Sequence, residues 1–212
     1  MGSGFVGLIL SAGESTRMGR EKALLAWPPV AGGGDSNAKQ TFLSAAIASL
    51  SPFCDMVLVI VGKNETTLTT IVHANSAALV RNPSPERGQF SSLQVGLQEV
   101  LNRGRDAAII TLVDRPPASP ATLEQLLAVF KVRIRKCWAV VPEYQGKHGH
   151  PIIVARELIE AFLKAPAGAT ARDVEHQHVQ HIEYVQIADP FVTMNLNTPE
   201  DYAALASSSF HK

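Results

Sequence analysis

An apolar segment over Phe5–Leu10 runs directly into the small-residue loop Ser11–Gly13, and Arg17 and Lys22 follow soon after. The segment has the length and aliphatic content of a strand that is buried on both faces. Small residues let the chain turn sharply and leave backbone N–H groups open to an anion. With two cations nearby, the pattern predicts a phosphate-binding loop at the end of a strand. Its spacing fits neither G-x-x-x-x-G-K-[ST] nor G-x-G-x-x-G.

Beyond this loop, strand-like and helix-like segments alternate along most of the chain. Apolar strands separated by amphipathic helices predict a mostly parallel sheet covered on both faces, a Rossmann-like three-layer α/β/α sandwich. We expect a single domain over 5–206, tails at 1–4 and 207–212, and a loop insertion at 27–39. The expected strands are 5–11, 55–61, 77–81, 107–113, 137–141 and 152–154, and the expected helices are 40–50, 64–75, 91–103 and one from Pro120 onward.

Composition excludes several classes of function. Lysine plus arginine and aspartate plus glutamate both number 19, so the formal net charge is zero. This balance gives no basic surface for nucleic acid or a membrane. No apolar stretch reaches the roughly 18 residues of a spanning helix. Cys54 and Cys137 lie beside apolar segments and are expected to be free thiols, so we expect a cytoplasmic protein without a signal peptide.

The loop after the first strand carries a specific resemblance. It is similar to the signature L-x-A-G-x-S-x-R-M-G-x-x-K of the MobA-like NTP transferases, and most similar to their molybdenum cofactor cytidylyltransferase branch. The resemblance implies a fold of the nucleotide-diphospho-sugar transferase type, catalytic cations at Arg17 and Lys22, and nucleotide binding by Leu10, Ser11, Ala12 and Gly13. The alternative is a tight β-to-α turn with surface cations. The matching residues are Leu10, Ala12, Gly13, Ser15, Arg17, Met18, Gly19 and Lys22.

Two segments resemble metal-binding elements of the same family. Asp114 follows the strand 107–113 directly, and carboxyl ends of parallel strands line the ligand crevice of such sheets. The resemblance implies that Asp114 is catalytic and holds Mg²⁺. Asn195 and Asn197, just before Thr198-Pro199-Glu200-Asp201, occupy positions where many relatives have aspartate. Either amide can ligate Mg²⁺. The alternatives are a turn residue at Asp114 and a helix cap at Thr198.

Two further elements resemble the family's substrate-binding loops. Residues 81–93 imply that Gly88 and Ser92 contact the nucleotide and Ser91 the acceptor, where a loop enters a helix; a plain serine cap is the alternative. Residues 146–151 imply that Gly149 and His150 contact the acceptor, with a β-turn as the alternative. No third ligand stands at a zinc spacing from His148 and His150. The remaining histidines, His176, His178 and His181, are expected to be solvated.

The resemblance implies nucleotidyl transfer from an NTP to a phosphorylated acceptor of the molybdopterin type, with release of pyrophosphate. Positioning, Mg²⁺ and cations suffice for such a reaction. Ala12, where the guanylyl branch commonly has glycine, favours CTP over GTP. Guanylyl transfer, a sugar- or polyol-phosphate nucleotidyltransferase, and a non-catalytic nucleotide- or cofactor-binding chaperone stay open. A molybdoenzyme or a chaperone is a further expected partner.

Overall fold

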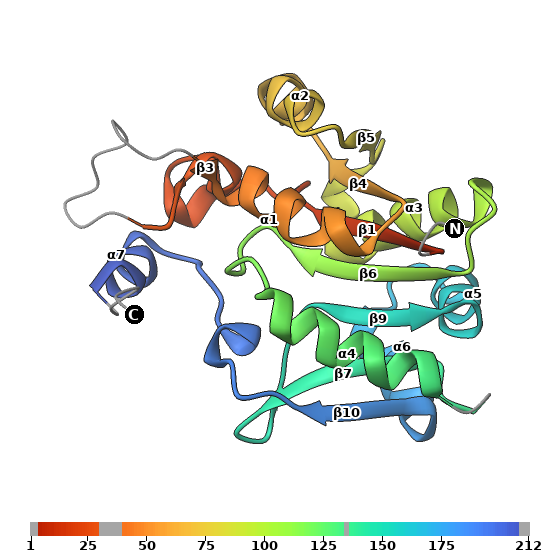
Figure 1. Cartoon of the computed structure of the whole chain (residues 1–212). Coiled ribbons are helices and arrows are strands. Elements are labelled where there is room, and N and C mark those ends of the chain that lie inside the picture. The colour runs from red at the N-terminus through yellow and green to blue at the C-terminus, as the bar shows by residue number, and fades with distance from the viewer. Residues whose placement is uncertain (1–3, 30–39, 134–135, 208–212) are drawn as a thin grey trace.

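The computed structural model describes residues 4–29, 40–133 and 136–207, and it centres on one mixed sheet (Figure 1). The strands follow the order β10-β7-β9-β6-β1-β4-β5, with the short β8 paired to β7. Neighbouring long strands are parallel except β9, which runs antiparallel to both β6 and β7. The strands are β1 (Phe5–Leu10), β4 (Met56–Val61), β5 (Ala78–Arg81), β6 (Ala107–Leu112), β7 (Ala139–Tyr144), β8 (Lys147–His148), β9 (Ile152–Ala155) and β10 (Ile182–Gln186).

Helices cover both faces of this sheet, which confirms the three-layer α/β/α fold (Figure 1). Apolar residues of α1, α2 and α4 form one core with one face of the sheet. Those of α3, α5 and α6 form a second core on the opposite face. The helices are α1 (Phe42–Leu50), α2 (Glu65–Ala74), α3 (Gln89–Asn102), α4 (Pro120–Val132), α5 (Arg156–Lys164), α6 (Ala171–Gln177) and α7 (Pro199–Ser207).

β1 shows why the strand segments are apolar throughout. It pairs with β4 on one side and β6 on the other, so all six of its residues are buried. Side chains alternate between faces along a strand. Accordingly Phe5 and Ile9 belong to the core beneath α1 and α4, whereas Val6, Leu8 and Leu10 belong to the core beneath α3. A continuous apolar run is therefore what a central strand of this sandwich requires.

Several predicted boundaries were wrong by a few residues. α3 begins at Gln89 with Gly88 as its N-cap, so Ser91 and Ser92 lie within its first turn and are buried. β7 extends to Tyr144 and forms a hairpin with β8, so part of the glycine-rich loop at 146–151 is strand. α5, α6 and β10 were not predicted, although Leu158, Ile159 and Phe162 of α5 are spaced as on one buried helix face.

A third, smaller core joins the C-terminal helix to the N-terminal half. It consists of Met18, Leu25, Phe42, Leu196, Tyr202 and Leu205. The Tyr202 hydroxyl also donates a hydrogen bond to the Ala26 carbonyl at 3.0 Å. Ala26–Trp27 (β2) pairs with Gln40–Thr41 (β3), at the two ends of the segment predicted as an insertion. Residues 30–39 of that segment, and 1–3 and 208–212 of the predicted tails, lie outside the described residues.

Candidate active site

The carboxyl ends of β1 and β6 border a cavity of about 340 Å³, which we call the phosphate cavity. Strand ends of an open α/β sheet are where ligands bind, because the connecting loops diverge there. Its lining brings the loop after β1 together with the residue after β6, the loop before α3 and the segment before α7. The lining residues are Leu10, Ala12, Gly13, Glu14, Ser15, Thr16, Arg17, Lys22, Pro85, Gly88, Gln89, Ser92, Leu112, Val113, Asp114 and Asn197.

Asn64 holds the loop after β1 in place. Its side-chain amide donates to the Ser11 carbonyl at 2.8 Å and to Glu21 Oε2 at 3.0 Å, while its Oδ1 accepts from the Gly62 N–H at 3.1 Å. Asn64 is the N-cap residue of α2, but its side chain makes no capping bond with that helix. The amide is used for the loop instead, a role that the sequence pattern did not reveal.

Gly62 is required where the same loop approaches β4. A Cβ at this position would lie 2.9 Å from the Ala12 carbonyl oxygen and 3.0 Å from Pro85 Cβ. Gly13, in contrast, has nothing within 4 Å of an added Cβ. The loop is therefore packed from below and open toward the cavity, which is the arrangement that an incoming phosphate needs.

Ser15 organises the second half of the loop. Its backbone adopts a left-handed conformation with φ 51°, and its hydroxyl accepts from the Lys22 N–H at 3.2 Å and donates to Glu21 Oε1 at 3.3 Å. Glu21 also accepts from the Ala23 N–H, which caps the short 3₁₀ helix Lys22–Leu24. These bonds fix the start of that helix and so direct the Lys22 side chain into the phosphate cavity.

Lys22 meets two of the predicted metal-binding residues. Its Nζ lies 3.4 Å from Asp114 Oδ2 and 3.2 Å from Asn197 Oδ1. The Lys22 and Asp114 side chains are 12% and 26% exposed, so this pair is shielded far more than a surface ion pair. Arg17 is exposed at the rim of the same cavity. Three parts of the chain far apart in sequence thus contribute polar side chains to one place, and two of them contribute charge.

The backbone around Asp114 fixes this carboxylate between β1 and the C-terminal segment. The Val113 N–H donates to the Leu10 carbonyl at 3.1 Å, and the Leu196 N–H donates to the Asp114 carbonyl at 2.8 Å. Asp114 Oδ1 is buried and has no hydrogen-bond partner among the described residues. A buried carboxylate oxygen without a donor suits a cation.

The donors present fit Mg²⁺ or a similar hard cation that is shared with phosphates. The described residues contain no group of three or more His, Cys, Asp or Glu that could enclose a metal ion by themselves. Mg²⁺ is commonly held by one or two protein oxygens plus substrate phosphates and waters. Asp114 and Asn197 offer that set. Asn195 is exposed and lines neither this cavity nor the one described next.

A second cavity of about 720 Å³, the apolar cavity, opens from the first. The two share Leu10, Gly88, Gln89 and Leu112. Gly88 has φ 91°, which favours glycine where the chain turns into α3. The apolar cavity is lined by Leu10, Arg87, Gly88, Gln89, Phe90, Ser91, Leu93, Gln94, Ile110, Leu112, His150, Ile152, Ala171, Arg172, Glu175 and residues 166–170.

Asn82 connects the end of β5 to the first turn of α3. The buried Asn82 amide donates to Ser91 Oγ and Ser92 Oγ, both at 2.9 Å, and its Oδ1 accepts from the Ser84 N–H. Ser91 Oγ in turn donates to the Gly88 carbonyl at 2.8 Å. The Ser91 hydroxyl is therefore already engaged in the fold, so its proposed role at the acceptor is one of shaping the wall.

Gly149 and His150 form a tightly packed turn beside the apolar cavity. The Gly149 N–H donates to the Pro142 carbonyl and the His150 N–H to the Val192 carbonyl, each at 2.8 Å. A Cβ on residue 149 would lie 2.2 Å from the Val192 carbonyl oxygen, so only glycine fits there. The half-buried His150 ring lines the cavity, and its Nδ1 has no partner among the described residues. Burial, with the Arg115 charge as a smaller cause, lowers the pKa of His150 to about 3.

Neither cysteine lines either cavity, nor do the histidines near the end of α6. His178 and His181 are half-buried and stack against Trp138, with the Trp138–His181 ring centroids 4.0 Å apart, so the expectation that they are solvated was wrong; His176 is exposed. Both cysteines are free. Burial raises the pKa of the Cys54 thiol to about 12, so Cys54 is not an activated nucleophile.

Most of the predicted site residues meet at these two cavities. Ser11 is buried beneath the loop, and Gly149 supports the turn without lining a cavity. The phosphate cavity receives Leu10, Ala12, Gly13, Arg17, Lys22, Gly88, Ser92, Asp114 and Asn197, and the apolar cavity receives Leu10, Gly88, Ser91 and His150.

Comparison with known proteins identifies related sequences and folds. A family model described as the MobA-like NTP transferase domain matches residues 7–182. The molybdenum cofactor cytidylyltransferase of Escherichia coli (strain K12) is 21% identical over 200 residues, which cover 92% of each chain. A probable molybdenum cofactor guanylyltransferase of Mycobacterium avium (strain 104) is 24% identical over 202 residues, which cover 95% of each chain.

Among solved structures, Rv0371c of Mycobacterium tuberculosis H37Rv in complex with manganese shares the fold. The TM-score is 0.74 at 21% identity, and the alignment covers 97% of this chain and 99% of that one. Within the described part of the chain, no helix is long and apolar enough to cross a membrane.

Proposed function

The chain belongs to the MobA-like NTP transferase domain family. We propose that it transfers a nucleoside monophosphate from an NTP to the phosphate of a molybdopterin-type acceptor and releases pyrophosphate. We propose CTP as the favoured NTP. The observation that carries the proposal is the cluster of Lys22, Asp114 and Asn197 in the phosphate cavity, which opens into the larger apolar cavity. Two relatives support a molybdopterin-type acceptor, because one is a molybdenum cofactor cytidylyltransferase and the other a probable molybdenum cofactor guanylyltransferase.

In this mechanism the loop after β1 binds the triphosphate through its open backbone N–H groups. Arg17 and Lys22 stabilise the negative charge that grows on the leaving pyrophosphate. Asp114 and Asn197 would hold Mg²⁺, which when bound neutralises phosphate oxygens and polarises the α-phosphorus. The manganese complex of a structural relative supports a divalent cation in such a site. The chain's main contribution is then to align the acceptor phosphate with the triphosphate.

The base preference rests on one methyl group. Ala12 lines the phosphate cavity, with its carbonyl against Gly62. A side chain here narrows the space beside the base and favours the smaller pyrimidine. Guanylyl transfer is the second candidate, because a guanylyltransferase relative matches as much of the chain as the cytidylyltransferase does.

A pyrophosphate-release assay tests the proposal. Wild-type protein is supplied with CTP, GTP, ATP or UTP and Mg²⁺, with and without molybdopterin. We expect acceptor-dependent release, fastest with CTP. A preference for GTP of tenfold or more, equal to ~1.4 kcal/mol, would reverse the base assignment. Nucleotide binding without turnover on any acceptor would instead favour a non-catalytic binding protein or chaperone. Turnover only with sugar or polyol phosphates would show that the acceptor is not of the molybdopterin type.

A further inference from the structure

The apolar cavity is placed to receive the body of the acceptor. It shares Gly88 and Gln89 with the phosphate cavity, so a phosphate bound at their junction can lie near the triphosphate while the rest of the acceptor extends away. Its volume of about 720 Å³ is that of a site for a whole small molecule. Phe90, Leu93 and Ile152 give it apolar walls. A flat heterocyclic ring fits such walls better than a sugar does.

Glu175 is a carboxylate in this otherwise mostly apolar lining. It is half-buried, and no described residue donates a hydrogen bond to it; Arg172, one turn earlier on α6, acts on it only at longer range. Burial raises the pKa of Glu175, with the Arg172 charge as a smaller opposing effect. A half-buried carboxylate at a cavity wall that accepts no hydrogen bond from the described residues can accept hydrogen bonds from a ligand that brings N–H groups.

The helix that carries Glu175 is firmly placed. The Thr170 hydroxyl accepts from the Asp173 N–H at 3.2 Å, while Asp173 Oδ2 accepts from the Thr170 N–H at 2.8 Å, which forms a capping box at the start of α6. Val174, the neighbour of Glu175, is 4% exposed and anchors the helix in the core beneath α3 and α5. The carboxylate is therefore held at the cavity wall by the fold and does not depend on a loose loop.

We propose that Glu175 is a specificity-determining residue that binds the acceptor's heterocycle through two adjacent N–H groups, those of a fused 2-amino-4-oxopyrimidine ring. A carboxylate accepts two parallel hydrogen bonds from such an edge, one from the ring N–H and one from the amino group. This inference rests on the proposed function, because the acceptor is there taken to be a molybdopterin-type molecule. A guanine base carries the same edge, so the test separates these two sources.

The test uses the full-length protein and free 6-methylpterin as probe, with 6-methyllumazine as its matched analogue, which has an oxygen in place of the 2-amino group. Binding is measured by quenching of probe fluorescence. We expect the wild type to bind the pterin at least tenfold more tightly than the lumazine, because the lumazine turns a carbonyl toward the carboxylate. Glu175→Gln should bind the pterin roughly tenfold more weakly and lose this discrimination.

Glu157→Gln is the matched control, since Glu157 is exposed on α5 and lines neither cavity. It should bind both probes as the wild type does, and both variants should melt at the wild-type temperature. A wild type that binds neither probe, or binds both alike, contradicts the proposal, as does a Glu175→Gln protein that still discriminates. A changed KM for GTP with unchanged pterin binding would assign Glu175 to a guanine base instead and would also overturn it.

Failure of the proposed function gives a different result. Suppose that the wild type discriminates pterin from lumazine through Glu175 but releases no pyrophosphate with any acceptor. This result would support the pterin-binding role of Glu175 and contradict the proposed transfer reaction. If transfer to molybdopterin proceeds in Glu175→Gln with an unchanged acceptor KM, the reaction stands and the role of Glu175 falls.

Discussion

At the scale of single residues, Lys22 connects the proposed triphosphate-binding loop with the proposed cation-binding residues. Its Nζ lies against Asp114 Oδ2 and Asn197 Oδ1, on the two residues that would hold a cation, so in this structure the ammonium pairs with the Asp114 carboxylate and donates to the Asn197 amide oxygen. A triphosphate with its own divalent cation would compete for the same oxygens and offer the lysine new negative charge. The side chain is thus close enough to serve both the protein carboxylate and the substrate phosphates.

We expect Lys22→Ala to lower turnover by roughly 10²-fold or more, the scale of losing one transition-state charge contact. Lys63→Ala is the matched control, because Lys63 is an exposed cation near the same loop that pairs with Glu14 at 2.7 Å. Steady-state pyrophosphate release compares the two. Normal kinetics in Lys22→Ala would remove this loop from the active site.

Asp114→Asn should fold normally and lose Mg²⁺-dependent turnover, because the charged ligand is replaced by a neutral one. Asn197→Ala should have a milder effect, since water can replace a neutral ligand, and Asn195→Ala should have none, because Asn195 lies outside both cavities. Titration of activity with Mg²⁺, together with Mn²⁺ binding followed by electron paramagnetic resonance, measures these differences. Full activity of Asp114→Asn at low Mg²⁺ would place the metal elsewhere.

His150 predicts a pH dependence of stability. Its pKa is about 3 in the folded chain and near 6.5 when unfolded, so the unfolded state binds the proton first and stability falls as pH drops below 6.5. Between pH 7 and pH 5 this one ring should cost about 1–2 kcal/mol in the free energy of unfolding. Urea unfolding of the wild type and of His150→Asn at both pH values measures the difference. An equal pH dependence in the two proteins would argue against a half-buried ring that stays neutral in the folded chain.

At the scale of elements, the site is built where several loops from distant parts of the chain converge at one edge of the sheet. α2 holds the loop after β1 through Asn64, and β5 holds the start of α3 through Asn82. Strand β9, the reversed strand between β6 and β7, brings the Gly149–His150 turn to the same edge. The loop after β1 is therefore held by a residue about fifty positions away in the sequence, whereas the start of α3 is held by the end of the strand that precedes it.

Removal of the Asn64 hydrogen bonds should change the position of the loop after β1 more than it destabilises the whole fold. We expect Asn64→Ala to lower the free energy of unfolding by about 1–3 kcal/mol, because it leaves the Ser11 carbonyl and Gly62 N–H without their partner. It should lower kcat/KM for the NTP roughly tenfold as the loop loses its fixed position. Asn75→Ala, at the opposite end of α2, is the control and should leave kcat/KM unchanged. Equal kinetic effects of both substitutions would mean that the loop does not depend on Asn64.

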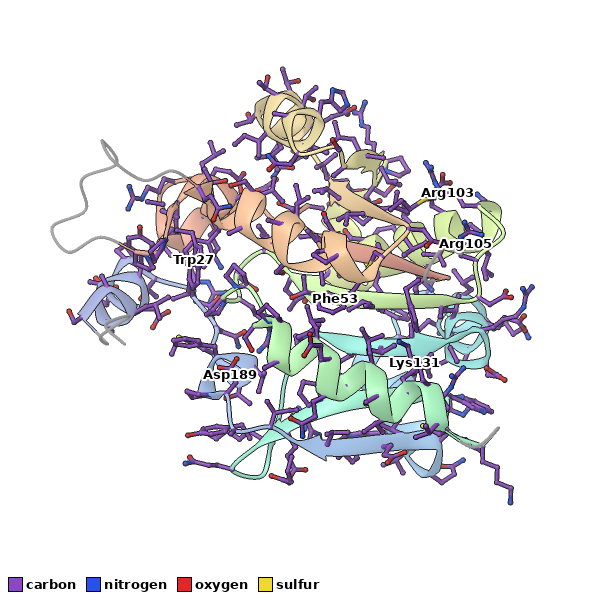
Figure 2. The ribbon with its side chains drawn as sticks, in the orientation of Figure 1. Trp27, Phe53, Arg103, Arg105, Lys131 and Asp189 are labelled. Carbon is purple, nitrogen blue, oxygen red and sulfur yellow. The ribbon has the colours of Figure 1, made fainter. Side chains whose placement is uncertain are left out.

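At the scale of the whole molecule, two large cores on opposite faces of the sheet and a third small one join the N-terminal and C-terminal parts of the chain. The two tryptophans report on different regions. Trp27 packs edge-on to Phe42 at 4.9 Å and lies near α7, as Figure 2 shows, whereas Trp138 stacks on His181 beside β7. We propose that residues 5–206 nonetheless unfold together as a single domain.

Two single-tryptophan variants test this. Trp138→Phe leaves Trp27 as the fluorophore and Trp27→Phe leaves Trp138, and each is unfolded in urea. A single domain predicts that fluorescence and circular dichroism give coincident transitions within each variant. Transitions that separate between the two probes within one variant would divide the chain into independently unfolding parts.

The layered α/β fold and most residues of the phosphate cavity could be predicted from the sequence alone. Buried parallel strands must be apolar along their whole length, and a phosphate loop must be small and glycine-containing, so both leave local patterns that can be read without a structure. The loop from Leu10 to Lys22 is the clearest case, since strand, turn and cations are adjacent in the chain.

Which distant residues meet could not be predicted from the sequence, because it depends on how the folded chain packs. Asn195 and Asn197 are equivalent by sequence, yet Asn197 alone of the two lines the phosphate cavity, because the Leu196 N–H is bound to the Asp114 carbonyl and sets the direction of the chain. Glu175 and Asn64 have ordinary local contexts, on a short polar helix and at a helix start. The contacts of Asn64 with the loop after β1 and the place of Glu175 in the apolar cavity depend on packing between distant segments, which leaves no periodic pattern in the sequence.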